Sequence, residues 1–313
     1  MTVDIIIPTY KPDEKFLHLI ERLLEQSVKI HKIIVMNTEE KYLSNLFFGM
    51  RYDKNARCIE IHHISKWQFD HGMTRNKGAS YSEADIMIFM TQDAIPTDEN
   101  LVKNLIAPLL ANDEVKVAYA RQVASEDSTL AEKFTRMYNY PQDSCLKDQS
   151  DIERLGIKTF FCSNVCAAYK REFFLQQNGF VKTAIFNEDM IYASGVVRSG
   201  YKIAYAADAC VIHSHNYTNK QQFKRNFDIA VSQKMHPEVF ADVSSEAEGK
   251  KYVKQAYAYF CEHKKPYFII PFGVTCVYKY IGFFLGKRYE SLSHRMVLKC
   301  TMNQRFFKIL WHI

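Results

Sequence analysis

Short apolar runs alternate with segments of helical period along the first hundred residues. The run Ile5-Ile6-Ile7 ends at Pro8 and reads as part of a strand at residues 3–10. Apolar residues then recur at helical spacing, at Phe16, Leu19, Ile20, Leu23 and Leu24. The same alternation predicts strands at 33–36, 59–61 and 86–90 and a helix at 73–82. Strands separated by helices form parallel sheets through right-handed crossovers, so we expect an α/β fold with a mostly parallel sheet flanked by helices.

The pattern continues less regularly beyond residue 97. We predict a helix at 98–110 capped by Asp98, a strand at 115–119, a helix at 187–199 ended by Gly200, and a strand at 202–205. Residues 124–156 are polar and acidic without a clear period, which indicates a mobile segment or a flap with one helix at 130–138. Residues 218–262 carry apolar side chains at helical intervals and are predicted to be helical.

Residues 266–313 form an apolar, aromatic and basic tail. The run 267–285 is long enough to cross a membrane, but Pro271, Gly273, Lys279 and Gly282 weaken that interpretation. Residues 264–313 hold nine Lys and Arg against the single acid Glu290, whereas the whole chain has a net charge of only +6. This composition predicts a helix that lies in the membrane interface beside anionic lipid. A nucleic-acid surface, an oligomer interface and a packed terminal helix are the alternatives.

Cysteine usage and the start of the chain indicate a reducing compartment. The eight cysteines form no Cys-x-x-Cys pair, and no secretory signal precedes the first predicted strand. The 313 residues are 47% hydrophobic and 24% charged, which suffices for a substantial core. We therefore expect a globular protein with a main domain at 1–235 and a helical extension at 236–313.

Three groups of side chains follow predicted strands or begin a predicted helix. Asp93 ends the strand at 86–90, Glu188 and Asp189 begin a helix, and His213 stands 24 residues after Asp189. Ligands of open α/β folds bind at the carboxyl ends of the strands. A divalent cation held by Asp93 and His213, with Asp189 left free as a base, would suit the transfer of a sugar from a nucleoside diphosphate. Each residue alone has an ordinary structural interpretation, such as a helix cap or a hydrogen-bonded core histidine.

The order of several motifs resembles one enzyme family. These motifs are Pro8-Thr9-Tyr10, the segment Gly72–Ala79, Thr91-Gln92-Asp93, Glu188-Asp189 and His213. Their order is that of family 2 glycosyltransferases with the GT-A fold, and the resemblance covers residues 1–235. The segments 69–76 and 89–94 are similar to the versions found in the rhamnosyltransferase branch. The resemblance implies that 1–235 is a GT-A catalytic domain.

The resemblance also implies a mechanism. The enzyme would be inverting, with dTDP-β-L-rhamnose as donor and with Asp189, next to Glu188, as catalytic base. Asp93 matches the second carboxylate of the family's Asp-x-Asp motif, and His213 matches the later histidine, so these residues would bind Mg²⁺ or Mn²⁺; His215 is the second choice. Thr91 stands where the motif has its first Asp, which predicts a weakly held ion.

Further positions are predicted to bind the two substrates. The donor set is Pro8, Thr9, Tyr10, Asn37, Thr38, Asp70, Arg75, Gln92 and Asp93. The acceptor set is Ser163 and Asn164. For Asp70 the alternative is a helix cap, and for Arg75 it is a surface ion pair.

The sequence thus predicts a cytoplasmic rhamnosyltransferase, peripheral on the inner face of the cell membrane, that extends a lipid-linked glycan for a bacterial cell-surface polysaccharide. We expect no nucleic-acid partner, and the oligomeric state is open. A transferase that uses a UDP-sugar, and a degenerate transferase that serves as a glycan-binding assembly subunit, are the alternatives. A nucleotidyltransferase is not favoured, because no Gly-rich phosphate loop with a following basic residue occurs near the first strand.

Overall fold

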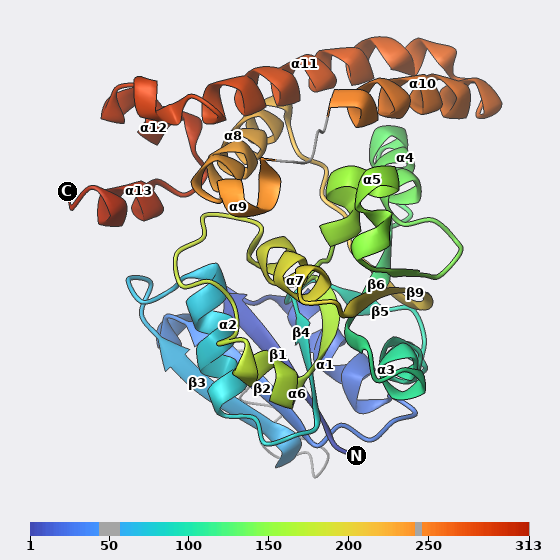
Figure 1. Ribbon diagram of the computed structural model, residues 1–313, viewed down its shortest axis with the longest axis vertical. Coiled ribbons are helices and arrows are strands. Elements are labelled where there is room, and N and C mark those ends of the chain that lie inside the picture. Colours follow the sequence, from blue (N-terminus) through green and yellow to red (C-terminus); the bar gives the residue numbers. More distant parts are fainter. Residues whose placement is uncertain (44–56, 242–245, 313) are drawn as a thin grey trace. The chain divides into compact units, whose positions relative to one another are not determined.

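The structure is a computed structural model that describes residues 1–43, 57–241 and 246–312 (Figure 1). The chain divides into two compact units. Unit 1 comprises Met1–Ser125, Asn139–Thr183 and Glu188–Ser214. Unit 2 comprises Glu126–Tyr138, Ala184–Asn187 and His215–Ile313. The domain boundary at residue 235 stays a prediction.

A mixed sheet forms the centre of unit 1. Its strands in the described residues are β1 (Val3–Tyr10), β2 (Lys32–Thr38), β3 (Ile59–Ile64), β4 (Ile86–Met90), β5 (Ile95–Pro96), β6 (Val115–Val123), β7 (Cys145–Lys147), β8 (Cys166–Lys170) and β9 (Lys202–Ile212). They are ordered β3-β2-β1-β4-β8-β6-β9-β5, with β7 also paired to β9. The predicted parallel pairing is found from β3 to β4 and between β6 and β9. Strand β8 is antiparallel to both β4 and β6, and it was not predicted.

Helices cover the sheet of unit 1 (Figure 1). They are α1 (Glu14–Leu24), α2 (His71–Ser80), α3 (Leu101–Ala111), α5 (Ile152–Leu155), α6 (Arg171–Gln176) and α7 (Glu188–Arg198), with short 3-10 turns at Glu40–Tyr42, Gln149–Asp151 and Gly156–Phe160. The predicted amphipathic pattern of α1 is confirmed, since Phe16, Leu19, Ile20 and Leu23 are buried in the main core. The predicted α/β fold class, with its helical C-terminal extension, is therefore confirmed.

Unit 2 is helical in its described part. Its elements are α4 (Leu130–Asn139), α8 (Asn219–Met235), α9 (Pro237–Phe240), α10 (Glu246–Glu262), α11 (Ile269–Gly286), α12 (His294–Cys300) and α13 (Gln304–Leu310), with 3-10 turns at Pro266–Phe268 and Tyr289–Ser291. Helix α11 packs closely on α8, because Gly282 and Gly286 meet the backbone of Phe223 and Phe227, where a Cβ atom would not fit.

Two apolar clusters hold unit 2 together. Phe134 of α4 packs with Ala256, Phe260 and Phe272 of α10 and α11. The second cluster brings together Ile185, Phe227, Val231, Val297 and Phe307. The helix predicted at 130–138 is thus present, whereas the helical stretch predicted at 218–262 is divided into three helices in its described part, with one break just before Pro237.

Candidate active site

The ends of β1 and β4 are joined by one side-chain amide. The Tyr10 backbone N–H donates to Gln92 Oε1 at 2.8 Å, and Gln92 Nε2 donates to the Tyr10 carbonyl oxygen at 3.2 Å. The first half of β1 pairs with β4 from Ile86 to Phe89, and beyond this pairing the side chain of Gln92 makes the contact to the end of β1. This contact fixes the loop that carries Asp93.

Asp93 and His213 lie close together, as predicted for a metal site. Asp93 Oδ1 is 3.6 Å from His213 Nε2. On the other side of the ring, His213 Nδ1 is 2.9 Å from Gln122 Oε1, and an amide oxygen there requires Nδ1 to be the protonated nitrogen. Gln122 Nε2 in turn donates to Tyr140 Oη at 2.5 Å and Ser163 Oγ at 3.0 Å. The network places the lone pair of the ring on Nε2, the nitrogen 3.6 Å from Asp93 Oδ1, and a hydrogen bond of this kind on the other ring nitrogen is usual for metal-binding histidines.

The second-choice ligand, His215, belongs to unit 2. Its ring lies beside Tyr217, with centroids 4.9 Å apart. One residue separates it from His213 along the chain.

Thr91 occupies the position where the resemblance expects a carboxylate. Its backbone N–H donates to the Val165 carbonyl oxygen at 3.1 Å, so the residue ties β4 to the start of β8. The hydroxyl oxygen is buried, and it has no hydrogen-bond partner among the described residues. A hydroxyl supplies no negative charge, so Asp93 remains the sole carboxylate of the Thr91-Gln92-Asp93 motif.

Glu188 and Asp189 begin α7 and are held by Asn164. The Asn164 backbone N–H donates to Asp189 Oδ2 at 3.0 Å, and its side-chain Nδ2 donates to Glu188 Oε1 at 3.2 Å. Tyr169 Oη donates to Asn164 Oδ1 at 2.7 Å. Both the nitrogen and the oxygen of the Asn164 side-chain amide therefore already make hydrogen bonds within the protein. The prediction that Asn164 binds the acceptor stays a prediction, but these contacts show it orienting the two carboxylates.

A buried ion pair accompanies the carboxylates. Arg75 Nη1 lies 3.1 Å from Glu188 Oε1, and both side chains are less than a tenth exposed. The same nitrogen donates to the His71 carbonyl oxygen at 2.9 Å. Arg75 does form an ion pair, but the alternative of a surface ion pair is wrong, because this pair is buried.

The two neighbouring carboxylates have opposite pKa shifts. Burial and the charge of Glu188 raise the pKa of Asp189 to about 7, and the backbone N–H groups of Asn164 and Met190 only partly oppose this. Burial also acts to raise the pKa of Glu188, but Arg75, His71 and Asn164 outweigh it and hold that pKa below its usual value. Glu188 is therefore ionised, and Asp189 exchanges its proton near neutral pH.

Asp70 caps helix α2. Its Oδ1 accepts hydrogen bonds from the backbone N–H groups of Gly72 and Met73, each at 2.9 Å. A Cβ atom at Gly72 would overlap the Val181 carbonyl oxygen, so glycine allows the first turn of α2 to lie against that segment. The capping alternative for Asp70 is confirmed, and contact with the donor stays a prediction.

The predicted nucleotide-binding residues meet at the ends of β1 and β2. Thr9 Oγ1 donates to Asn37 Oδ1 at 3.2 Å, and Asn37 Nδ2 lies 3.0 Å from His63 Nδ1 on β3. The Thr38 hydroxyl oxygen is buried and has no partner within the described ranges. Tyr10 is more exposed and packs edge to face on Tyr42, with ring centroids 5.6 Å apart.

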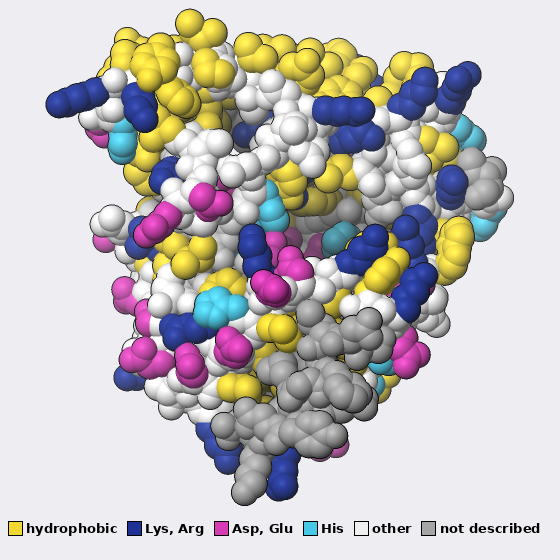
Figure 2. Space-filling model, turned by 180° about the vertical axis from the view of Figure 1, so that it is seen from behind, with side chains coloured by type: hydrophobic (Ala, Val, Ile, Leu, Met, Phe, Trp, Pro, Cys, Tyr) yellow, Lys and Arg dark blue, Asp and Glu magenta, His cyan; other side chains and the backbone are white. Residues whose placement is uncertain are grey.

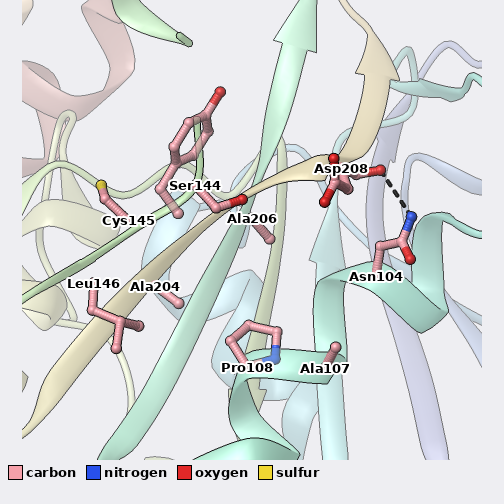
Figure 3. Close-up of a pocket in the computed structure, with 10 residues that line it drawn as sticks. Asn104, Ala107, Pro108, Ser144, Cys145, Leu146, Ala204, Ala206 and Asp208 are labelled. Atoms are coloured by element: carbon pink, nitrogen blue, oxygen red, sulfur yellow. Dashed lines mark hydrogen bonds between the residues drawn. The ribbon is translucent and has the colours of Figure 1, made fainter. Parts of the chain in front are cut away.

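Unit 1 also has a surface hollow that is lined by other residues. It measures about 360 Å³ and is lined by residues of α3, β9 and the segment around Cys145 (Figure 3). Asn104 Nδ2 donates to the Asp208 carbonyl oxygen at 2.9 Å on one side of it. None of the predicted site residues lines this hollow, so it carries no part of the candidate chemistry.

Sequence reasoning missed Gln122, Tyr140 and Tyr169. Gln122 bonds to the ring of His213 from 91 positions away, Tyr140 accepts a hydrogen bond from Gln122, and Tyr169 donates to Asn164. Gln122 is buried near the end of β6. The signal in the sequence that could have found it is a polar residue next to apolar residues of this strand.

Comparison with known proteins adds a family and relatives. The model of glycosyl transferase family 2 matches residues 4–176. The O-antigen chain rhamnosyltransferase RfbN of Salmonella typhimurium is 34% identical over 294 residues, which cover 93% of this chain and 91% of the relative. The O-antigen chain rhamnosyltransferase WbaN of Salmonella anatum is 35% identical over 295 residues, which cover 92% of this chain and 90% of the relative.

Solved structures of low sequence identity share the fold. The mannosyltransferase PcManGT from Pyrobaculum calidifontis, in complex with GDP-Man and Mn²⁺, has a TM-score of 0.58 at 13% identity and covers 99% of this chain and 87% of its own. Residues 1–349 of S. aureus TarS in complex with UDP-GlcNAc have a TM-score of 0.53 at 11% identity, with 92% of each chain covered.

Proposed function

Since the chain belongs to glycosyl transferase family 2 and has the GT-A fold, it is a glycosyltransferase, and we propose that the sugar it transfers is L-rhamnose. The donor in this proposal is dTDP-β-L-rhamnose, and the acceptor is a hydroxyl of a lipid-linked glycan in bacterial cell-surface polysaccharide synthesis. Two relatives named O-antigen chain rhamnosyltransferases, each matching about nine tenths of the chain, support it.

The observation that carries the mechanism is the state of Asp189. Two backbone N–H groups fix its carboxylate, one on each oxygen. Its pKa of about 7 is that of an efficient general base at neutral pH. In the proposed reaction Asp189 removes the proton from the attacking acceptor hydroxyl, and the sugar is transferred with inversion. Glu188 and Arg75 position and tune this base.

The Asp93 and His213 side chains fit a divalent cation. One carboxylate oxygen and one imidazole nitrogen suit Mn²⁺ or Mg²⁺, and the Gln122 contact leaves His213 Nε2 as the ligand atom. A bound ion would supply positive charge beside the departing nucleoside diphosphate. Because Thr91 provides no second carboxylate, we propose that the ion is held weakly by the protein alone and more tightly with the donor bound.

The donor side of the proposal rests on the sheet edge and on α2. Tyr10, exposed beside Tyr42, offers a ring face for the base of the nucleotide, next to Thr9 and Asn37. Pro8, Thr38 and Asp70 complete the predicted donor set. Arg75 Nε is buried without a hydrogen-bond partner in the described part of the chain, so we propose that a donor oxygen or a water molecule serves as its partner.

We further propose that the enzyme is peripheral on the cytoplasmic face of the membrane. Among the described residues, one helix, Pro266–Gly286, is long and apolar enough to cross a membrane, with a mean hydropathy of 1.7. One side of α11 packs on α8, which suits a helix lying in the interface. The other side exposes an apolar stripe, here the α11 stripe, formed by Ile270, Val274, Val277, Ile281 and Phe284. Figure 2 shows hydrophobic side chains gathered in the region of this helix.

The test is transfer by the purified protein in a panel of nucleotide sugars. Products of dTDP-, UDP- and GDP-sugars with a lipid-linked acceptor are identified by mass. Rhamnosyl transfer from the dTDP donor is expected. Transfer from UDP-sugars alone would refute the rhamnose assignment, and no transfer with retained glycan binding would favour an assembly subunit.

A further inference from the structure

Unit 2 contains a cavity that the proposed catalytic steps do not use. It measures about 250 Å³ and is lined by α4, by residues 215–217, by Gln222 of α8 and by residues between Phe268 and Lys279 on α11 and the turn before it, and we call it the α4–α11 cavity. Its volume corresponds to about eight water molecules, which leaves room for a phosphate or diphosphate group. Hydrogen-bonding side chains line it, among them Thr135, whose Oγ1 lies 2.8 Å from Tyr252 Oη.

The charges in and beside the cavity leave an excess of positive charge. The carboxylate of Glu132 is already paired with Arg136, at 2.8 Å. Lys279 also lines the cavity, and no carboxylate pairs with its ammonium group among the described residues; the ammonium lies 5.5 Å from the centroid of the Tyr252 ring. Burial lowers the pKa of Lys279, as expected for a cation held without a partner.

A second cation stands next to the lining. Arg225 stacks on the rings of Phe186 and Tyr217, at 4.6 and 5.7 Å, and it too makes no ion pair in the described part of the chain. Tyr217 lines the cavity. An anion entering the cavity would therefore meet Lys279, which pairs with no carboxylate among the described residues, with Arg225 behind the Tyr217 ring and Glu132 already paired with Arg136.

The rim of the cavity meets the α11 stripe. Pro271 lines the cavity and is exposed. Val274, three residues further on, is its neighbour on the surface of the helix, and Val274 in turn neighbours Ile270, four residues before it. These two side chains begin the stripe and are 47% and 71% exposed. A hydrocarbon chain leaving the cavity at Pro271 would thus remain on apolar surface.

We propose that the α4–α11 cavity binds the phosphate or diphosphate end of a hydrocarbon-anchored acceptor, with Lys279 as its cation and the α11 stripe beneath its chain. The identification of the ligand as the acceptor rests on the proposed function. His215 lines the cavity and follows His213 after one residue, so the chain limits the separation of their Cα atoms to about 7 Å.

Equilibrium binding of small probes tests the cavity without any sugar transfer. The probes are farnesyl diphosphate, farnesol and inorganic diphosphate. Wild-type protein is expected to bind farnesyl diphosphate more tightly than either part alone. Lys279→Met should weaken this binding about tenfold to a hundredfold, the usual effect of losing a charged hydrogen bond. Lys254→Met, at an exposed position on α10, is the matched control and should leave it unchanged.

Several outcomes would overturn the proposal. One is equal affinity of the wild type and Lys279→Met for farnesyl diphosphate. Another is displacement of that probe by dTDP, which would assign it to the donor site. A third is Lys279-dependent binding of anionic phospholipid vesicles without binding of farnesyl diphosphate, which would assign the cation to bulk lipid. Ala131→Phe, designed to fill the cavity from α4, should also weaken binding, and unchanged affinity would count against the site.

Because these assays contain neither donor sugar nor glycan, they separate this proposal from the proposed function. Loss of rhamnosyl transfer with intact, Lys279-dependent probe binding would refute only the rhamnose assignment. Transfer to a lipid-linked acceptor that is indifferent to Lys279→Met would refute only the cavity.

Discussion

Replacement of Glu188 by glutamine should shift the pH dependence of the enzyme to lower pH. The side chain of Glu188 accepts from Arg75 and Asn164 through a single oxygen, Oε1, so the Glu188→Gln amide oxygen can keep both contacts while the charge is lost. That charge is one of the two causes that raise the pKa of Asp189 to about 7. The substitution therefore tests the role of Asp189 as base while leaving the Asp189 side chain itself unchanged.

The magnitude follows from Coulomb's law. Two neighbouring unit charges in a protein with an effective dielectric constant of about 20 repel by ~2 kcal/mol or more, which corresponds to at least about one pKa unit. Arg75, no longer neutralised by Glu188, acts in the same direction. We therefore expect the pKa of Asp189 to fall by at least about one unit.

The assay is kcat/KM for sugar transfer from about pH 5 to about pH 9. A general base acts when it is deprotonated, so wild-type activity should be complete above the pKa of Asp189 and fall about tenfold per pH unit below about 7. In Glu188→Gln the acid limb should move down, and the plateau should drop modestly because a weaker base transfers protons less well. Glu172→Gln, at an exposed position on α6, is the matched control. An acid limb that coincides with the wild type in a folded Glu188→Gln protein would refute the assignment.

Further predictions concern the base, the metal site and the packing of α11. Asp189→Asn should lower kcat about 10²- to 10⁴-fold with donor affinity unchanged in equilibrium titrations, and near-normal turnover would exclude Asp189 as the base. His213→Ala should weaken Mn²⁺-dependent donor binding about tenfold or more, and chelation should affect the wild type but not this variant. Gln122→Leu should lower Mn²⁺ affinity about tenfold to a hundredfold, measured by metal titration, because His213 loses its orienting partner. Gly282→Leu should destabilise the protein by about 1–3 kcal/mol in thermal unfolding, whereas Gly273→Leu, where nothing lies within 4 Å of the added Cβ, should not.

The central strands could be predicted from the sequence because both faces of each are covered. Ile5, Ile6 and Ile7 are all fully buried, so β1 reads as a continuous apolar run, and β4 does the same. Strand β8 could not be predicted in this way. Its residues 166–170 are mostly small, and its strand conformation depends on antiparallel pairing with β4 and β6, which lie far away in the sequence.

The sequence motifs predicted which residues form the candidate site, but they did not predict the hydrogen bonds that orient these residues. Asp93 and His213 were expected to meet, and their 3.6 Å separation confirms the proximity. The orienting contacts of Gln122 and Asn164 link residues 91 and 24 positions apart, and no local pattern marks them. Likewise, the tail was recognised as apolar and basic, but only packing shows which side of α11 is used by α8.

The ion pair between Arg75 and Glu188 is difficult to explain as a source of stability. Both side chains are less than a tenth exposed, and removing two charges from water offsets most of what their attraction gains. Apolar residues of similar size would hold α2 and α7 together as well or better. The pair does, however, set the charge beside Asp189, since it keeps Glu188 ionised and so helps to keep the pKa of Asp189 near neutral. A buried charge pair that contributes little to the fold but fixes the protonation of its neighbour is what a base at this position requires.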